Sequence, residues 1–129
     1  MPIVNETLEK ELQYVADPKE QAHIRALWKH ADPLMQEISV NLIQGKNVEV
    51  GTLTESALEK GFSANTILDD GLIAGMAIVG VKFRDNLIFV PEVLVAARAM
   101  KAGMVYIEPI LSEIRALFSK SLIIFFLSE

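Results

Sequence analysis

The chain has 129 residues, of which 51% are hydrophobic, and it contains no cysteine. This length suffices for one domain with a buried core, and the lack of cysteine excludes disulfides, thiolate metal sites and a cysteine nucleophile. The net charge is −5 and the basic residues are scattered, which argues against binding to nucleic acid. The N-terminus is acidic and polar, unlike a secretory signal, and the apolar run at residues 122–127 is too short to cross a membrane. We therefore expect a soluble, cytoplasmic protein.

Two Asp-Pro pairs mark the beginnings of helices. In each pair an aspartate suited to capping, Asp17 or Asp32, precedes a proline that fits the first helical turn. The pairs predict helices over residues 18–30 and 33–44. The second of these helices is expected to end at Gly45.

Three further helices follow along the chain. Asn47 is expected to cap a short helix over residues 48–60. Ser63 caps the next helix, which is expected to end at Arg84, and Pro91 begins a long last helix. The last two carry apolar residues with helical spacing.

These elements predict an all-α fold. The four helices between residues 32 and 108 are typical of an up-and-down four-helix bundle. We expect three regions: an N-terminal helical arm over residues 1–31, the bundle over residues 32–118, and an apolar tail over residues 119–129. The arm has apolar residues that are expected to pack on the bundle or on a second chain: Leu8, Leu12 and Val15.

Residues 71–104 are not explained by ordinary helix building. Gly71, Gly75 and Gly80 interrupt one apolar run, and each glycine in a helix costs about 0.5–1 kcal/mol relative to alanine. Close approach of another surface, either a neighbouring helix or a flat ligand, would explain them. Tight packing between helices is the favoured interpretation.

The same region carries three ordered motifs: GLIAGMAIVGVKF at residues 71–83, FVPEV at residues 89–93 and ARAMK at residues 97–101. In this order and spacing they closely resemble the helical cap of corrinoid proteins in cobalamin-dependent methyl transfer, including the cap of cobalamin-dependent methionine synthase. The resemblance extends over roughly residues 32–113.

The resemblance implies a set of cofactor-binding residues. In the family, the residues at the positions of Phe83, Val90 and Val93 lie over the upper face of the corrin and shield the cobalt-bound methyl group. Apolar bulk suits this role because the methyl–cobalt bond is sensitive to water and side reactions. The alternative is that all three side chains belong to the bundle core.

The cobalamin-binding domain of the family ligates cobalt through the histidine of a D-x-H-x-x-G motif, on a Rossmann-type fold. The sequence contains no such motif, and His23 and His30 are expected to be solvated rather than metal ligands. The resemblance therefore implies that cobalamin is bound only together with a partner Rossmann-type domain. The expected partners are a cobalamin-binding domain or a methyltransferase subunit, and a homodimer is a further option.

No catalytic residue is expected, because the sequence has no nucleophile–base pair and no phosphate loop. The resemblance implies a cap module that shields methylcobalamin during methyl transfer from a C1 donor such as a methylamine, methanol or a methoxy compound. The alternative is a non-catalytic helical domain for dimerisation or interaction, or a corrinoid sensor.

The tail at residues 119–129 holds six consecutive apolar residues. Such a segment is prone to aggregate unless it is buried. Either it packs into a groove or a dimer interface, or it results from a frameshift or early stop.

Overall fold

The computed structural model describes residues 5–127, with side chains for residues 5–117. Every regular element in that part of the chain is helical, which confirms the all-α fold class. In chain order the elements are α1 (Glu6–Glu11), the 3-10 helix η1 (Leu12–Tyr14), α2 (Pro18–His30), α3 (Pro33–Ile43), α4 (Asn47–Glu59), α5 (Ala64–Thr66), the π-helix η2 (Ile67–Ile73), α6 (Ala74–Arg84) and α7 (Val90–Leu127).

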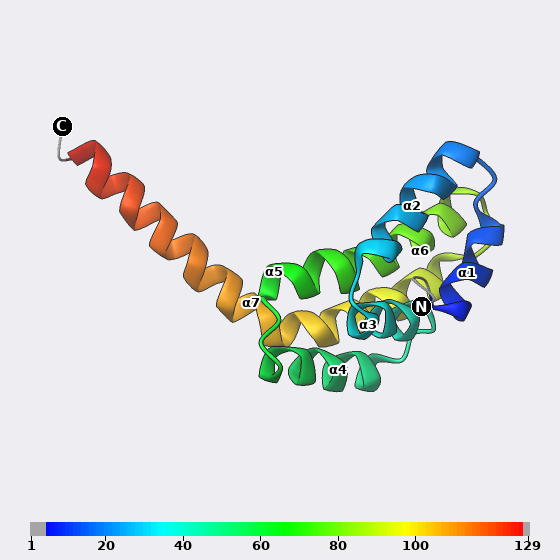
Figure 1. The fold of residues 1–129 in the computed structure, drawn as a ribbon, viewed down its shortest axis with the longest axis horizontal. Coiled ribbons are helices and arrows are strands. Elements are labelled where there is room, and N and C mark those ends of the chain that lie inside the picture. Colours follow the sequence, from blue (N-terminus) through cyan, green and yellow to red (C-terminus); the bar gives the residue numbers. More distant parts are fainter. Residues whose placement is uncertain (1–4, 128–129) are drawn as a thin grey trace.

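The bundle is built from four helical segments (Figure 1). They are α3, α4, the uninterrupted run of α5, η2 and α6, and the first part of α7. α3 packs against α4, η2 and α6, and α4 packs extensively against α7. α6 and α7 also contact each other, and the turn between them forms a helical hairpin at one end of the bundle.

The helix starts agree with the predicted caps at two Asp-Pro pairs. The side chain of Asp17 accepts a hydrogen bond from the backbone N–H of Lys19 at 3.1 Å, and Asp32 accepts one from Leu34 at 2.9 Å. The prediction for Asn47 was wrong. It is the first residue of α4 rather than its cap, and the residue before it makes no side-chain capping bond.

The π-helix η2 was not predicted, since a single regular helix was expected over this stretch. A π-helix bonds i to i+5, so carbonyls at its ends lose their regular partners. Two side chains supply donors there. The Ser39 hydroxyl donates to the Gly71 carbonyl at 2.6 Å, and the Trp28 indole N–H donates to the Ala74 carbonyl at 3.2 Å.

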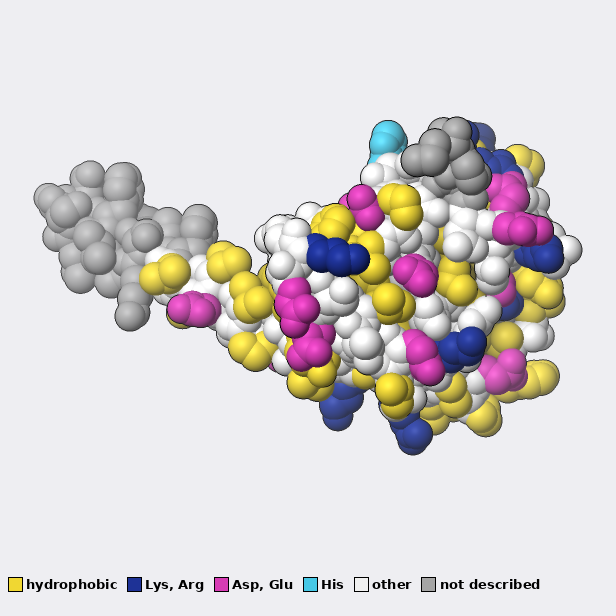
Figure 2. Space-filling model, turned by 60° about the horizontal axis from the view of Figure 1, so that its bottom comes forward, with side chains coloured by type: hydrophobic (Ala, Val, Ile, Leu, Met, Phe, Trp, Pro, Cys, Tyr) yellow, Lys and Arg dark blue, Asp and Glu magenta, His cyan; other side chains and the backbone are white. Residues whose placement is uncertain are grey.

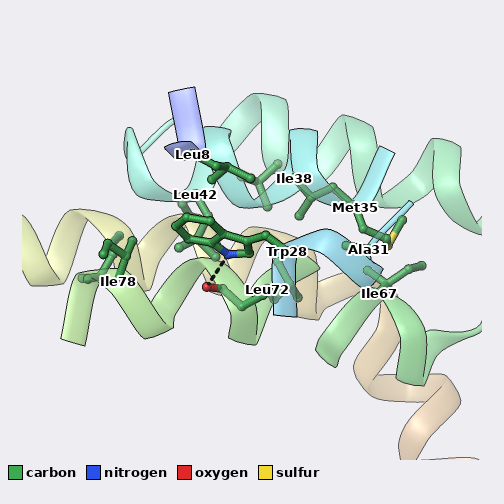
Figure 3. Packing of buried hydrophobic residues seen from close by; sticks show 14 of the residues in the cluster. Leu8, Trp28, Ala31, Met35, Ile38, Leu42, Ile67, Leu72 and Ile78 are labelled. Carbon is green, nitrogen blue, oxygen red and sulfur yellow. Dashed lines mark hydrogen bonds between the residues drawn. The ribbon is translucent and has the colours of Figure 1, made fainter. Parts of the chain in front are cut away.

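The N-terminal arm, formed by α1, η1 and α2, shares the core of the bundle. Figure 3 shows the fully buried Trp28 of α2 among Leu8 from α1, Ile38 and Leu42 from α3, and Leu72 from η2. The apolar positions expected to pack are all buried in this core: Leu8, Leu12 and Val15. Of the two surfaces considered for the arm, the bundle is therefore the one that it covers.

Two of the three glycines serve helix packing. A Cβ on Gly75 would lie 3.2 Å from the Cα and carbonyl oxygen of Ser39, and one on Gly71 would lie 3.1 Å from Ile38 Cγ2. Both positions therefore let α3 approach closely. Gly80 differs, because a Cβ there would meet none of the described atoms within 4 Å. The packing interpretation is confirmed for the first two glycines and wrong for Gly80.

α7 is much longer than the bundle and projects beyond it (Figure 1). It begins at Val90, one residue before the expected start, and passes through Pro109. Its backbone stays helical to Leu127, so the segment expected to be a tail continues this helix. The predictions about burial of the tail concern side chains outside the described part of the chain.

Candidate functional site: the exposed apolar hairpin between α6 and α7

The hairpin between α6 and α7 is fixed by hydrogen bonds at both ends. Asn86 has φ 62°, and the N–H of Leu87 donates to the Lys82 carbonyl at 2.8 Å. This is a Schellman arrangement, which ends α6. At the start of α7, the Glu92 carboxylate accepts a hydrogen bond from the Phe89 N–H at 3.0 Å, as in a capping box. The turn therefore has a defined backbone.

Apolar side chains on this hairpin face solvent. We define the hairpin patch as the five exposed residues Phe83 (44% exposed), Leu87 (49%), Phe89 (68%), Val90 (55%) and Leu94 (62%). Figure 2 shows hydrophobic side chains at the end of the molecule where the hairpin lies. Soluble proteins rarely leave large apolar side chains grouped on the surface unless they bind something. The patch is therefore the candidate binding surface.

The structure places the three predicted site residues in two environments. Phe83 and Val90 lie on the patch, at the end of α6 and the start of α7. Val93 is half-buried and packs against the bundle core. The alternative that all three belong to the core is therefore wrong for Phe83 and Val90, and it fits Val93.

Sequence reasoning missed the other members of the patch. Leu87 and Phe89 stand on either side of Ile88 in a tight turn, where no helix face covers them. Leu94 lies one helical turn after Val90, on the same side of α7. The signal in the sequence for Leu87 and Phe89 was the presence of apolar residues within a predicted turn.

A cavity of about 240 Å³ lies behind the hairpin, between the end of α3, α6 and α7. Its lining includes Ile43, Gly45, Val79, Lys82, Ile88 and Val95. Gly45 has φ +73°, and an added Cβ would lie 2.3 Å from Val95 Cγ1, so the loop after α3 needs glycine there. The loop thus touches α7 closely at one point, while the space beside it leaves the hairpin incompletely backed by core packing.

Arg84 forms the main electrostatic contact beside the patch. Its guanidinium donates to both carboxylate oxygens of Glu20 at 2.7 and 2.8 Å, and to Asp85 at 3.0 Å. Hydrogen bonds from Arg84 lower the pKa of Glu20 and the pKa of Asp85. The same carboxylates raise the pKa of Arg84. All three groups therefore stay charged at neutral pH.

Within the described residues, the other titratable groups form no comparable cluster. His23 and His30 are exposed on α2. Partial burial, followed by repulsion from Asp69, raises the pKa of Asp70. Among the residues that the structure describes, no group of three or more His, Cys, Asp or Glu side chains could hold a metal ion. Within the same part of the chain, no helix has the length and apolar character needed to span a membrane.

Comparison with known proteins identifies the family. The B12 binding domain family matches residues 34–108, and the chain belongs to this family. The matched residues comprise α3 to α6 and the bundle part of α7, including the whole hairpin. The arm formed by α1, η1 and α2 lies outside the match.

Curated relatives are corrinoid proteins. The chain is 29% identical over 76 residues to a corrinoid protein of Desulfitobacterium hafniense, covering 59% of this chain and 35% of that protein. It is 37% identical over 70 residues to monomethylamine corrinoid protein 1 of Methanosarcina acetivorans (54% and 32%), and 36% identical over 83 residues to the dimethylamine corrinoid protein of Methanosarcina barkeri (64% and 38%). The chain spans about a third of the length of these relatives. No solved structure matches it.

Proposed function

We propose that this chain acts as the helical cap of a corrinoid methyl-transfer system. In this role the hairpin patch covers the upper face of methylcobalamin, which a Rossmann-type cobalamin-binding domain holds from the other side. The observation that carries the proposal is the exposure of Phe83 and Val90, two positions that the family motifs assign to the corrin. A role in the bundle core would have buried both.

The chemistry of the patch suits such a cover. Cobalamin, when bound, supplies the cobalt that carries the methyl group. The five patch residues offer apolar bulk without a side chain that would compete for the metal, and they exclude water from the surface that they cover. Gly80 adds open space, since it lies one turn before Phe83 on α6 and a Cβ added to it would meet no atom of the described residues within 4 Å. A flat ligand can therefore come close to the backbone of α6.

The names of two relatives support a choice of methyl donor and of docking partner. Their names specify monomethylamine and dimethylamine corrinoid proteins, which supports a methylamine as the C1 donor and a methyltransferase as the protein that docks. The methyl group must be uncovered when the methyltransferase binds. Contact between the patch and the corrin is therefore weak and reversible.

Replacing Phe83 tests the proposal directly. In a mixture of the full chain with a methylcobalamin-loaded cobalamin-binding domain, Phe83→Ala should speed photolysis of the methyl–cobalt bond. Because Phe83 is 44% exposed, the free energy of unfolding should change by less than the ~3–5 kcal/mol typical of a core Phe→Ala change.

Val105→Ala provides the matched control, because Val105 is 63% exposed on α7 and lies about 22 Å along that helix from Val90. It should leave photolysis at the rate measured with the unmodified chain. An unchanged photolysis rate in Phe83→Ala, together with a core-sized loss of stability, would rule out the covering role.

A second candidate function is association of two chains through α7. Where α7 leaves the bundle, Ile110, Ile114 and Leu117 are exposed and recur with helical spacing. Sedimentation equilibrium of the full chain and of Ile114→Lys tests it. A dimer that dissociates in the variant supports association, and a monomer in both excludes it.

A further inference from the structure

The last turn of α6 places a cation on each side of Phe83, and both cations bind the N-terminal arm. The first is Lys82, whose Nζ lies 2.8 Å from Glu11 Oε2 and 4.5 Å from the centre of the Tyr14 ring. The Lys82 and Glu11 side chains are only 16% and 17% exposed. Partial burial of this kind reduces screening by solvent and salt.

The second cation is Arg84, which binds Glu20 of α2 through two parallel hydrogen bonds of 2.7 and 2.8 Å. Forked pairs of this kind fix orientation as well as distance. The side chains are 54% and 27% exposed, so this pair is weaker per contact than a buried one. Phe83 therefore lies between two ion pairs to different elements of the arm.

Ile88 packs against the core, but an open pocket of about 240 Å³ beside it limits the packing behind this turn. Lys82 also lines that cavity, and its carbonyl accepts the Leu87 N–H at 2.8 Å. Lys82 thus joins the arm through its side chain and the turn through its backbone. A change at Glu11 is expected to reach the turn through Lys82.

We propose that the arm positions the patch: Glu11 and Glu20 are positioning residues that hold the last turn of α6, and with it Phe83, through Lys82 and Arg84. The inference rests on the proposed function, because the position of Phe83 matters only if its side chain covers a ligand. It assigns a role to the arm, which lies outside the residues matched by the family.

Hydrogen exchange in the free full chain tests whether Glu11 and Glu20 hold the last turn of α6. Glu11→Gln combined with Glu20→Gln should speed amide exchange across residues 83–88 by roughly fivefold, the scale expected for losing one partly buried and one exposed ion pair. Glu9→Gln is the control, since Glu9 pairs with Arg25 inside the arm and contacts no α6 residue through that pair. It should leave exchange at residues 83–88 unchanged.

The salt dependence of amide exchange distinguishes positioning by ion pairs from a general loss of structure. In the unmodified chain, raising the salt concentration to 1 M should bring exchange at residues 83–88 part of the way toward the rate of the double variant, because salt screens the exposed Arg84–Glu20 pair and acts less on the partly buried Lys82–Glu11 pair. The double variant itself should respond little. Equal exchange in the double variant and the unmodified chain at low salt would overturn the inference.

The photolysis assay connects the turn to the ligand. With a methylcobalamin-loaded cobalamin-binding domain, the double variant should give a rate between those of the unmodified chain and Phe83→Ala. If Phe83→Ala speeds photolysis and the double variant does not, the positioning role is wrong and the proposed function stands. If Phe83→Ala has no effect, the proposed function fails and the positioning role fails with it.

Discussion

Gly80 is a residue at which stability and binding should respond in opposite directions. It is exposed in the interior of α6 and has open space around it. Gly80→Ala should raise the free energy of unfolding of the free chain by about 0.5–1 kcal/mol, because alanine loses less backbone freedom in a helix. The same methyl group should weaken binding to a methylcobalamin-loaded domain if a flat ligand approaches α6 there. Urea denaturation and titration of the two proteins measure the two effects.

Gly75→Ala is the comparison for this substitution. Its Cβ would lie 3.2 Å from the backbone of Ser39, so α3 would have to shift and the chain should lose stability. A loss of stability in Gly80→Ala as well would show that α6 is packed on both sides, which would contradict the open surface beside Phe83.

Thr54 is a second residue whose replacement should change the stability of the chain. Its Oγ1 is buried in α4 and has no hydrogen-bond partner in the described part of the chain. Thr54→Val replaces the hydroxyl by a methyl group of similar size, so it should stabilise the chain by about 1 kcal/mol. Denaturation by urea tests this, with Ser39→Ala as the contrast.

Ser39 is buried too, but its hydroxyl donates to the Gly71 carbonyl at 2.6 Å. Removing it leaves the Gly71 carbonyl with the Ala74 N–H as its remaining donor, and we expect a loss of about 0.5–1.5 kcal/mol. A destabilised Thr54→Val would indicate that the Thr54 hydroxyl has a partner after all.

At the scale of elements, the contact between α2 and α6 should depend on pH. The hydrogen bond from Arg84 lowers the pKa of Glu20 below its ordinary value of 4.5. A lowered pKa in the folded state stabilises the fold above the unfolded-state pKa, and this contribution disappears as the pH falls through the lowered value. The unmodified chain should therefore lose more stability than Glu20→Gln between roughly pH 5 and pH 3.

Urea denaturation at several pH values in that window measures the difference. Glu55→Gln, which changes an exposed residue of α4, is the control and should follow the unmodified chain. Parallel pH dependence in Glu20→Gln and the unmodified chain would mean that the pair between α2 and α6 does not form in solution.

Comparing the helices with their predictions shows which features the sequence alone could predict. Asp17 and Asp32 could be identified because an aspartate before proline satisfies local hydrogen bonds, and local chemistry decides where such helices begin. The π-helix η2 could not be predicted from the sequence. Carbonyls at its end accept hydrogen bonds from Trp28 of α2 and Ser39 of α3, which are distant in the sequence. The core role of Trp28 was missed for the same reason.

At the scale of the whole molecule, the arm and the bundle form one core around Trp28 rather than two separate units (Figure 3). The motifs predicted Phe83 and Val90 as site residues, and the structure leaves both exposed. Leu87, Phe89 and Leu94 were not predicted, although apolar residues within a predicted turn were a signal for the first two. The exposure of all three depends on how the hairpin leaves the bundle, which is a property of the tertiary fold.

We propose that the hairpin patch, and no other surface, faces the corrin. The most direct test is paramagnetic broadening of methyl resonances in the full chain, after addition of a cobalamin-binding domain loaded with cob(II)alamin, whose unpaired electron broadens nearby signals. We predict selective broadening of Val90, Leu87 and Leu94, with Val48 and Val105 unaffected. Broadening centred on Val48 or Val105, or broadening of none of these residues, would contradict the account.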